Sequence, residues 1–402
     1  MQQQNTMKRY LTDSACTSLA FFCSLLFYWP LFAADDPIDS ARILMKAGDN
    51  AAQIRSAIKK VPSEYREGLS FLLNYMPERD LQQLSSDYLL GNVQYAYKAW
   101  EESPWKDQIS KDLFFNNILP YVSINERRDN WRQSFYEKFK PLIEGIDSPG
   151  LAAATLNQKI FPLLKVKYST KRKKADQSPF ESMESGLASC TGLSIMLIDA
   201  CRAVGIPARF VGTPLWSDGS GNHSWVEVYD QGWHFTGAAE PAGDALDKAW
   251  FIGRAAKAQR DSQPHAIYAV SFRHTPQPFP MVWKRGADYV HSVNVTDRYT
   301  QLGQSLPPGH VNLMFRIFDG GSGDRCSAPL TIKQSDGDVI FQGKSKDERF
   351  DANDHLTVAV PEGETFQLSI PSKSGMPLTR IIKAESGGQL IELELPSGKD
   401  SR

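Results

Sequence analysis

The feature that most constrains the fold is an apolar helix that begins at a cysteine. Ser189 is a good N-terminal cap, while Gly205 and Pro207 are residues that typically end a helix. Between them, apolar side chains recur at helical spacing: Leu193, Met196, Leu197, Ala200, Cys201 and Val204. We therefore predict a helix that begins at Cys190 and packs its apolar face against a core.

Cys190 lies in the first turn of this predicted helix. Unpaired N–H groups and the positive end of the helix dipole favour an anion there, so the thiol pKa falls toward the range of a nucleophile. The alternative is a cysteine that only packs. The polar neighbours Ser189 and Thr191 favour the functional interpretation. Cys201 falls on the apolar face and is expected in the core, and Cys326 is expected to be structural.

A predicted β-hairpin follows the helix. Residues 222–229 and 233–236 have the composition of strands, and Asp230-Gln231-Gly232 is a tight turn between them. The segment 208–213 is a third strand candidate. His223 begins the first hairpin strand and is our candidate general base for Cys190, although a histidine on a strand is often only a hydrogen-bonded core residue. For His234 we favour a structural role.

A third group must orient the base. If the turn centres between Asp230 and Gln231, His223 faces about residue 238, so Glu240 lies within two residues of that point. Glu240 is our choice. Asp244 is the second choice, and Thr236 or a backbone carbonyl remain alternatives.

These residues carry a resemblance to a known family. Gly-Leu-Ala-Ser-Cys190-Thr-Gly, Gly-Ile-Pro-Ala-Arg209 and His223-Ser-Trp-Val-Glu-Val-Tyr together resemble the core of the transglutaminase-like superfamily, over about residues 165–255. The resemblance implies a papain-like cysteine protease fold and a Cys-His-Asp triad, in which Cys190 and His223 take the first two roles. The family's aspartate has no match after Trp233, so Glu240 is inferred as its substitute.

The resemblance also implies a reaction. A Cys190 thiolate would attack an amide carbonyl, release an amine and pass the acyl group from a thioester to water or to a second amine. The oxyanion would need the Cys190 N–H and a side-chain donor, for which Tyr168 and Gln177 are candidates. We expect an exported cysteine peptidase, amidase or protein-glutamine transglutaminase. The alternative is a catalytically inactive binding or scaffolding protein, which the missing aspartate favours.

The length of 402 residues implies more than one core. We predict an α+β protein with four parts: a signal peptide at 1–34, a helical region at 35–145, the catalytic domain at 146–275 and a β-rich, sandwich-like domain at 276–402. The last part contains short alternating runs separated by turn residues. These runs are 311–318, 330–333, 339–342, 356–360, 366–370 and 390–395.

The N-terminal segment predicts export. Lys8 and Arg9 precede an apolar run over residues 19–31, which ends in Phe32-Ala33-Ala34. A retained membrane anchor is the alternative, but the run is shorter than the ~20 residues of a spanning helix. After cleavage three cysteines remain, an odd number that cannot form a disulfide framework.

Charge and motif content exclude other classes. A net charge of -1 makes nucleic acid an unexpected partner. The resemblance to the transglutaminase-like superfamily implies a protein or peptide substrate. The chain lacks Cys-x-x-Cys and His-Glu-x-x-His, and we predict neither a metal nor a cofactor. The charged segment 125–132 is predicted as a solvated helix face, with the alternative that Arg127 or Arg128 reaches over the cleft. The sequence leaves the oligomeric state open.

Overall fold

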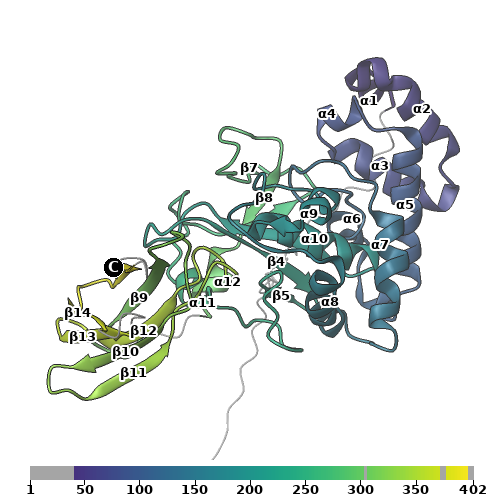
Figure 1. The fold of residues 1–402 in the computed structure, drawn as a ribbon. Helices are drawn as coiled ribbons and strands as arrows, with labels where there is room; N and C mark the ends of the chain where they lie inside the picture. Colours follow the sequence, from purple (N-terminus) through teal and green to yellow (C-terminus); the bar gives the residue numbers. More distant parts are fainter. Residues whose placement is uncertain (1–39, 303–305, 372–376, 397–402) are drawn as a thin grey trace, which may run out of the picture. The chain divides into compact units, whose positions relative to one another are not determined.

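The computed structural model describes residues 40–302, 306–371 and 377–396. Residues 37–402 form one compact unit, and its fold is α+β as predicted (Figure 1). The predicted signal peptide lies outside the described residues. Among the residues that are described, none of the helices is both long and apolar enough to span a membrane.

The first part of the unit is helical, as predicted. Its helices share a core with the helices and sheet that follow, formed by residues such as Leu72, Trp105 and Phe139. The α-helices are α1 (Ser40–Ala47), α2 (Ala51–Lys60), α3 (Arg66–Tyr75), α4 (Glu78–Leu81), α5 (Ser86–Glu101), α6 (Lys111–Asn117) and α7 (Arg132–Phe139). Short 3-10 helices lie at Gly48–Asn50, Ser63–Tyr65, Lys106–Gln108 and Lys140–Ile143.

The charged segment 125–132 differs from both predictions. It is a loop that leads into α7, and Arg128 is paired with the buried Asp80 through a 2.9 Å contact. Arg127 pairs with Asp129 at 2.7 Å. Arg132 is 2% exposed and donates hydrogen bonds to the carbonyl oxygens of residues 118, 119 and 120. The charges therefore satisfy buried loop backbone, which apolar side chains could not do.

Helix α10 (Cys190–Ala203) lies at the centre of the next part. It packs against β4 on one side and α7 on the other (Figure 1). Every residue of the helix after Cys190 is buried, so the helix is enclosed on all sides and not on one face alone. The elements that precede it are α8 (Pro149–Leu164), β1 (Lys167–Tyr168), α9 (Pro179–Ser185) and β2 (Leu187–Ala188).

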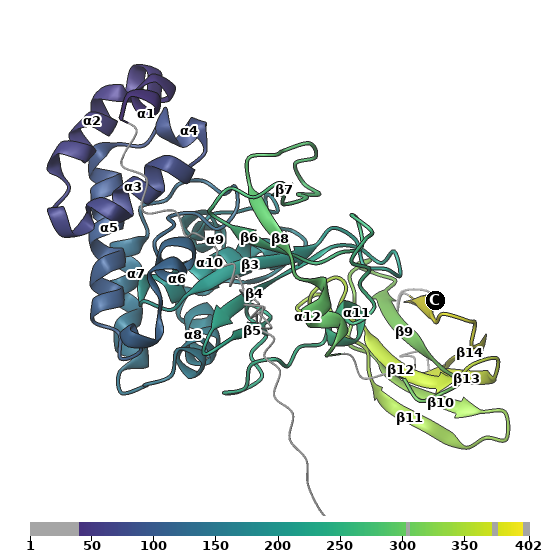
Figure 2. The same ribbon diagram turned by 180° about the vertical axis from the view of Figure 1, so that it is seen from behind.

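A six-stranded antiparallel sheet supports α10 (Figure 2). Its order is β5-β4-β3-β6-β8-β7. The strands are β3 (Ala208–Thr213), β4 (His223–Tyr229), β5 (Trp233–Thr236), β6 (Tyr268–Ser271), β7 (Gln277–Pro278) and β8 (His291–Asn294). The sheet thus includes strands beyond residue 275, where the sequence predicts the end of the catalytic domain. The short helix α11 (Ile252–Ala255) lies between β5 and β6, and α12 (Thr296–Thr300) follows β8.

The C-terminal part consists of two sheets around one core. One sheet has the order β11-β10-β13-β14 and the other β12-β9-β15, and Phe315, Ile332 and Leu368 are among the side chains buried between them. The strands are β9 (His310–Asp319), β10 (Pro329–Gln334), β11 (Val339–Lys344), β12 (Leu356–Pro361), β13 (Thr365–Ile370), β14 (Leu378–Lys383) and β15 (Gln389–Leu395). The predicted strands are all present. Strand β14 is an addition to them.

We predict that Arg132→Leu lowers the free energy of unfolding by about 3 kcal/mol or more, because it leaves buried carbonyl groups without donors. Urea unfolding measures the change. The matched control is Arg55→Leu on the exposed side of α2, which should stay within ~0.5 kcal/mol of wild type. Equal effects of the two substitutions would contradict the assignment of Arg132 as a buried support.

Candidate active site

Cys190 is the first residue of α10, as predicted. The Ser189 hydroxyl accepts a hydrogen bond from the Gly192 N–H at 3.1 Å and donates to the Ala175 carbonyl at 2.6 Å. This capping holds the first turn in place. Cys190 is partly exposed, whereas Cys201 is fully buried in the core as predicted.

The first turn of α10 is joined to the start of β4. The hydroxyls of Thr191 and Ser224 are 3.1 Å apart, in hydrogen-bond distance. The backbone N–H groups of Thr191 and Ser224 both donate to the Cys190 sulfur and favour its thiolate. Burial and the nearby Asp351 carboxylate outweigh these donors and raise the pKa of the Cys190 thiol. The thiolate therefore needs a neighbouring cation.

His223 supplies the titratable neighbour. It begins β4, its side chain is 1% exposed, and aromatic rings enclose it. The Trp250 and Phe251 ring centroids lie 4.9 and 5.0 Å from the imidazole centroid, and Trp216 and Trp225 lie at 6.0 and 5.8 Å. Such a wall excludes water and strengthens electrostatic interactions at the imidazole.

The acidic partner of His223 is Asp351, a residue of the C-terminal part. Its Oδ2 lies 3.6 Å from His223 Nδ1, and its side chain is also 1% exposed. One ligand atom each from Cys190, His223 and Asp351 lie within 4.8 Å of one another. With Nδ1 facing Asp351, the Nε2 atom is left for the thiol. Sequence reasoning missed Asp351, which lies in a loop with no periodic pattern.

Glu240, which the sequence predicts as the residue that orients His223, is not the partner of His223 in the structure. Its carboxylate accepts a 2.8 Å hydrogen bond from the Trp250 indole. The hairpin turn has three residues, with Gln231 at a φ of 56°, and β5 ends at Thr236. Asn157 of α8 then bonds to both the Gly237 carbonyl and the Ala239 N–H. The chain thus leaves the sheet before it reaches His223. Asp244 contacts Gln158 instead, at 3.1 Å.

The loop that carries Asp351 joins β11 to β12. Arg325 organises it by donating to several of its backbone carbonyl oxygens, at distances of 2.6 to 3.5 Å. These acceptors are residues 347, 350, 351, 352 and 354. Two contacts fasten the loop to the core: the Ala352 N–H donates to the Tyr168 hydroxyl at 2.8 Å, and the Asn353 amide donates to the Asn222 carbonyl at 2.9 Å.

The electrostatics of the pair favour an ionised Asp351. Burial alone raises the pKa of this carboxyl group, but its interaction with His223, together with the Asn353 N–H, brings the pKa below the ordinary value. Neither ring nitrogen of His223 has a hydrogen-bond partner among the described residues. A protonated imidazole would draw Asp351 closer, so the pair is suited to stabilise an imidazolium.

Comparison with known proteins identifies the core. Residues 138–237 match the model of the transglutaminase-like superfamily. This segment is a transglutaminase-like core. The match includes Cys190 and His223 but not Asp351. The superfamily consists in general of thiol-dependent enzymes. No curated protein sequence matches the chain.

Solved structures with local similarity include a proposed cysteine protease from Cytophaga hutchinsonii, with 17% identity and a TM-score of 0.27 over 47% of this chain and 64% of that one. The chain thus spans 64% of the length of that protein. The pilus 2b backbone protein of group B streptococcus has 12% identity and a TM-score of 0.15, over 34% and 50% of the two chains. The Bacillus anthracis TIE protein has 10% identity and a TM-score of 0.17, over 62% and 72%.

The structure separates the two predicted oxyanion donors. Gln177 is 1% exposed, and its amide is committed to the loop around it, including a 2.9 Å bond to the Leu187 carbonyl. Tyr168 lies beside the site, where burial and the negative charges of Asp351 and Cys190 raise its pKa. Its hydroxyl oxygen accepts from Ala352, which leaves the hydroxyl proton available to a substrate.

A cavity of about 790 Å³ adjoins the transglutaminase-like core at this point. Tyr168, Leu193, Glu240, Trp250 and Phe350 are among the residues that line it. Leu193 lies one turn after Cys190, and Trp250 contacts His223, so this cavity is the candidate substrate cleft. Glu240 is thus a wall of the cleft.

Buried charges explain the strand motifs. Arg209 and Glu227 are direct partners across β3 and β4, and their side chains form a 2.7 Å ion pair. Glu227 also accepts hydrogen bonds from Arg298 and from the Tyr299 hydroxyl. Tyr299 in turn accepts from the Trp225 indole at 2.7 Å. This network fixes β4 and therefore His223. His234, by contrast, lies on the outer strand β5 and pairs with Asp247, which agrees with a structural role.

Among the described residues, one group of side chains is close enough to hold a metal ion, and it consists of Cys190, His223 and Asp351. Sulfur, imidazole and carboxylate ligands would suit zinc. The sequence predicts no metal, and this stays a prediction to be tested below.

We predict that Cys190 reacts with iodoacetamide well below pH ~8.5, because a protonated His223 stabilises its thiolate. In His223→Ala, burial keeps the thiol pKa raised, so the rate at pH 7 should fall by about tenfold or more and recover only as pH rises. Asp351→Asn should also slow labelling, because the loss of the carboxylate destabilises the His223 imidazolium by more than it relieves the repulsion between Asp351 and the thiolate. Labelling is followed by peptide mass.

The control for Asp351→Asn is Glu240→Gln, which also replaces a carboxylate by an amide near the cleft. It should not slow labelling, because Glu240 is bonded to the Trp250 indole and its charge raises the pKa of the Cys190 thiol. A strong effect of Glu240→Gln with none for Asp351→Asn would restore Glu240 as the orienting residue.

Proposed function

We propose that this protein is a thiol-dependent acyl-transfer enzyme that acts on peptide or side-chain amides through a Cys190 thioester. The observation that carries the proposal is the convergence of Cys190, His223 and Asp351 within 4.8 Å. The transglutaminase-like core supports the same conclusion. Fold similarity alone would not suffice, because function depends on the site.

The groups have complementary tasks in the proposed reaction. His223 takes the thiol proton, and the Cys190 sulfur attacks the amide carbonyl carbon. The C–N bond then breaks, the amine leaves with the proton returned by His223, and a thioester remains. Water or an amine, deprotonated by His223, attacks the thioester and releases Cys190. Asp351 holds the imidazole and balances its charge throughout.

Hydrolysis is the version we favour. The cleft is lined by exposed charged side chains such as Lys167 and Arg349 as well as by the apolar Leu193, so water can reach a bound acyl group. Transamidation between glutamine and an amine uses the same thioester and is the main alternative. The outcome depends on how well the bound acyl group is shielded from water.

A catalytically inactive binding or scaffolding protein is the second candidate. Two observations favour it: burial raises the pKa of the Cys190 thiol, and the Asp351 contact at 3.6 Å is longer than a hydrogen bond. Catalytic contacts are often long without substrate and shorten when substrate binds. We therefore rank this candidate below the enzyme.

We further propose that the protein acts after export, with residues 1–34 as its signal and a protein or peptide as its substrate. The net charge of -1 gives no reason to expect nucleic acid.

The decisive test is capture of the thioester. The full-length protein is incubated with a library of glutamine-containing peptides and quenched in acid, and the mass of the peptide that contains Cys190 is measured. We expect an acyl adduct that hydroxylamine removes and that Cys190→Ala lacks. Incubation with EDTA should leave adduct formation unchanged. Loss with EDTA and recovery with zinc would assign the three residues to a metal site instead.

Tyr168→Phe tests the oxyanion donor. Removing one such donor typically costs ~100-fold or more in kcat, so we expect a loss of that order. Iodoacetamide labelling of the same variant reports separately whether loss of the Ala352 contact displaces Asp351. Tyr95→Phe, which removes a hydroxyl from α5, is the matched control and should keep wild-type kcat. Equal kcat in both variants would remove Tyr168 from the mechanism.

A further inference from the structure

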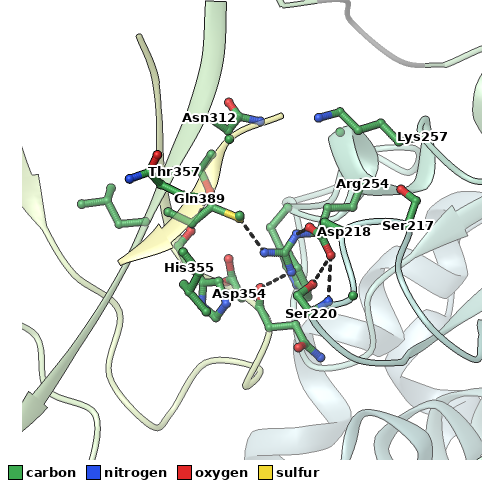
Figure 3. Close-up of a pocket in the computed structure, with 18 of the residues that line it drawn as sticks. Ser217, Asp218, Ser220, Arg254, Lys257, Asn312, Asp354, His355, Thr357 and Gln389 are labelled. Atoms are coloured by element: carbon green, nitrogen blue, oxygen red, sulfur yellow. Dashed lines mark hydrogen bonds and ion pairs between the residues drawn. The ribbon is translucent and has the colours of Figure 1, made fainter. Parts of the chain in front are cut away.

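A second cavity of about 600 Å³ lies between the core and the C-terminal sheets (Figure 3). Trp250 lines both this cavity and the substrate cleft. Figure 3 shows side chains of the core, including Ser217, Arg254 and Lys257, facing Asn312 and Gln389 of the C-terminal strands. The cavity is therefore next to the reacting groups but distinct from the cleft.

The acidic side chains of this cavity are already paired. Asp218 accepts from the Ser220 N–H at 2.9 Å and from the Ser220 hydroxyl, and it lies 3.4 Å from the Arg254 Nε. Asp354 is bonded to Lys346. These carboxylates are thus poor sites for a cationic ligand, because binding one would disrupt bonds that exist within the protein.

The cationic groups are only partly satisfied. Arg254 donates through Nη1 to the Asn353 carbonyl at 2.7 Å, but the acceptor beside Nη2 is the Met314 thioether at 2.9 Å. A thioether is a weak acceptor for a guanidinium. The Arg254 side chain is 13% exposed, so a ligand can reach it, and burial lowers its pKa without removing its charge.

Lys257 adds a second cation one turn beyond Arg254, and it has no ion pair among the described residues. His355 also lines the cavity, but burial and the neighbouring arginines lower its pKa to about 3, so it is neutral at pH 7. Three cations, those of residues 254, 257 and 346, therefore face the two carboxylates of residues 218 and 354. The balance is positive.

We propose that this cavity binds an acidic peptide, with one carboxylate on Arg254 Nη2 and another on the Lys257 ammonium group. A carboxylate is a stronger acceptor for a guanidinium N–H than a thioether, so it would replace the weak contact of Nη2 with Met314. Because Trp250 lines both this cavity and the substrate cleft, a carboxylate carried by a peptide is the anion that we assign to it. Asn312 and Gln389 are neutral groups that line the same space.

The site also defines a substrate class, and this part rests on the proposed function. Because Trp250 forms a wall of both cavities, a peptide whose amide lies at Cys190 can extend a neighbouring acidic side chain toward Arg254. The cavity would then select substrates with glutamate or aspartate near the reacting amide. Arg254 would be a specificity residue, remote from the bonds that break.

The test is a binding measurement on full-length Cys190→Ala protein, which cannot turn over substrate. The probes are two fluorescein-labelled octapeptides, one of alternating glutamate and glycine and one of alternating glutamine and glycine, and anisotropy gives their Kd values. We expect tighter binding of the glutamate peptide. Arg254→Gln and Lys257→Gln should each weaken that binding by about tenfold, the cost of one charge-assisted contact.

Lys59→Gln is the control, because it removes one positive charge from the exposed side of α2 and should leave Kd unchanged. Lys257 is exposed, so Lys257→Gln should fold normally. This variant keeps the proposal testable even where Arg254→Gln prevents folding. Equal Kd values for both peptides, or equal weakening by Lys59→Gln, would overturn the proposal. So would tighter binding of inorganic phosphate than of the glutamate peptide. A binding peptide that forms no thioester on wild-type protein would refute the proposed function while leaving this site in place.

Discussion

The pairing of His223 with Asp351 is the interaction on which the site depends. Both side chains are 1% exposed, and a charge buried without a partner would be strongly unfavourable. The imidazole comes from the core sheet and the carboxylate from a loop of the C-terminal part. Two residues position this loop: Arg325 of the C-terminal part and Tyr168 of the core. The C-terminal sheets are therefore part of the site, and not a spacer beside it.

Arginines perform the same task at both ends of α10, where Arg202 is buried and Arg325 is half-buried. At its C-terminal end, Arg202 donates to the Asn117, Val122 and Ala208 carbonyls, beside Arg132. At its N-terminal end, Arg325 bonds the loop that holds Asp351. Irregular backbone cannot be buried unless its polar groups are satisfied, and a guanidinium can satisfy several carbonyls at once. These contacts fix α10, and with it Cys190, relative to His223.

Much of the site follows from local patterns. The cap at Ser189 and the spacing of apolar residues predict a helix that begins at Cys190, and the alternation after Asn222 predicts the strand that begins at His223. The prediction of Glu240 failed because of a contact that is distant in the sequence. The observed register would place His223 opposite about residue 239, but Asn157 of α8 turns the chain away after Thr236. A contact from a distant helix cannot be recognised in an alternating pattern.

By itself, the sequence determined the local elements: the helix with its cysteine, the strand with its histidine, and the alternating strands of the C-terminal region. Hydrogen bonding and side-chain periodicity over a few residues are enough to specify these. Only the tertiary structure decided which carboxylate meets His223, that α10 is enclosed on all sides, and that Arg254 faces a cavity. Asp351 lies in a loop and Arg254 in a helix of four residues, which is too short for a periodic pattern to orient it, so their positions depend on how separate cores pack together.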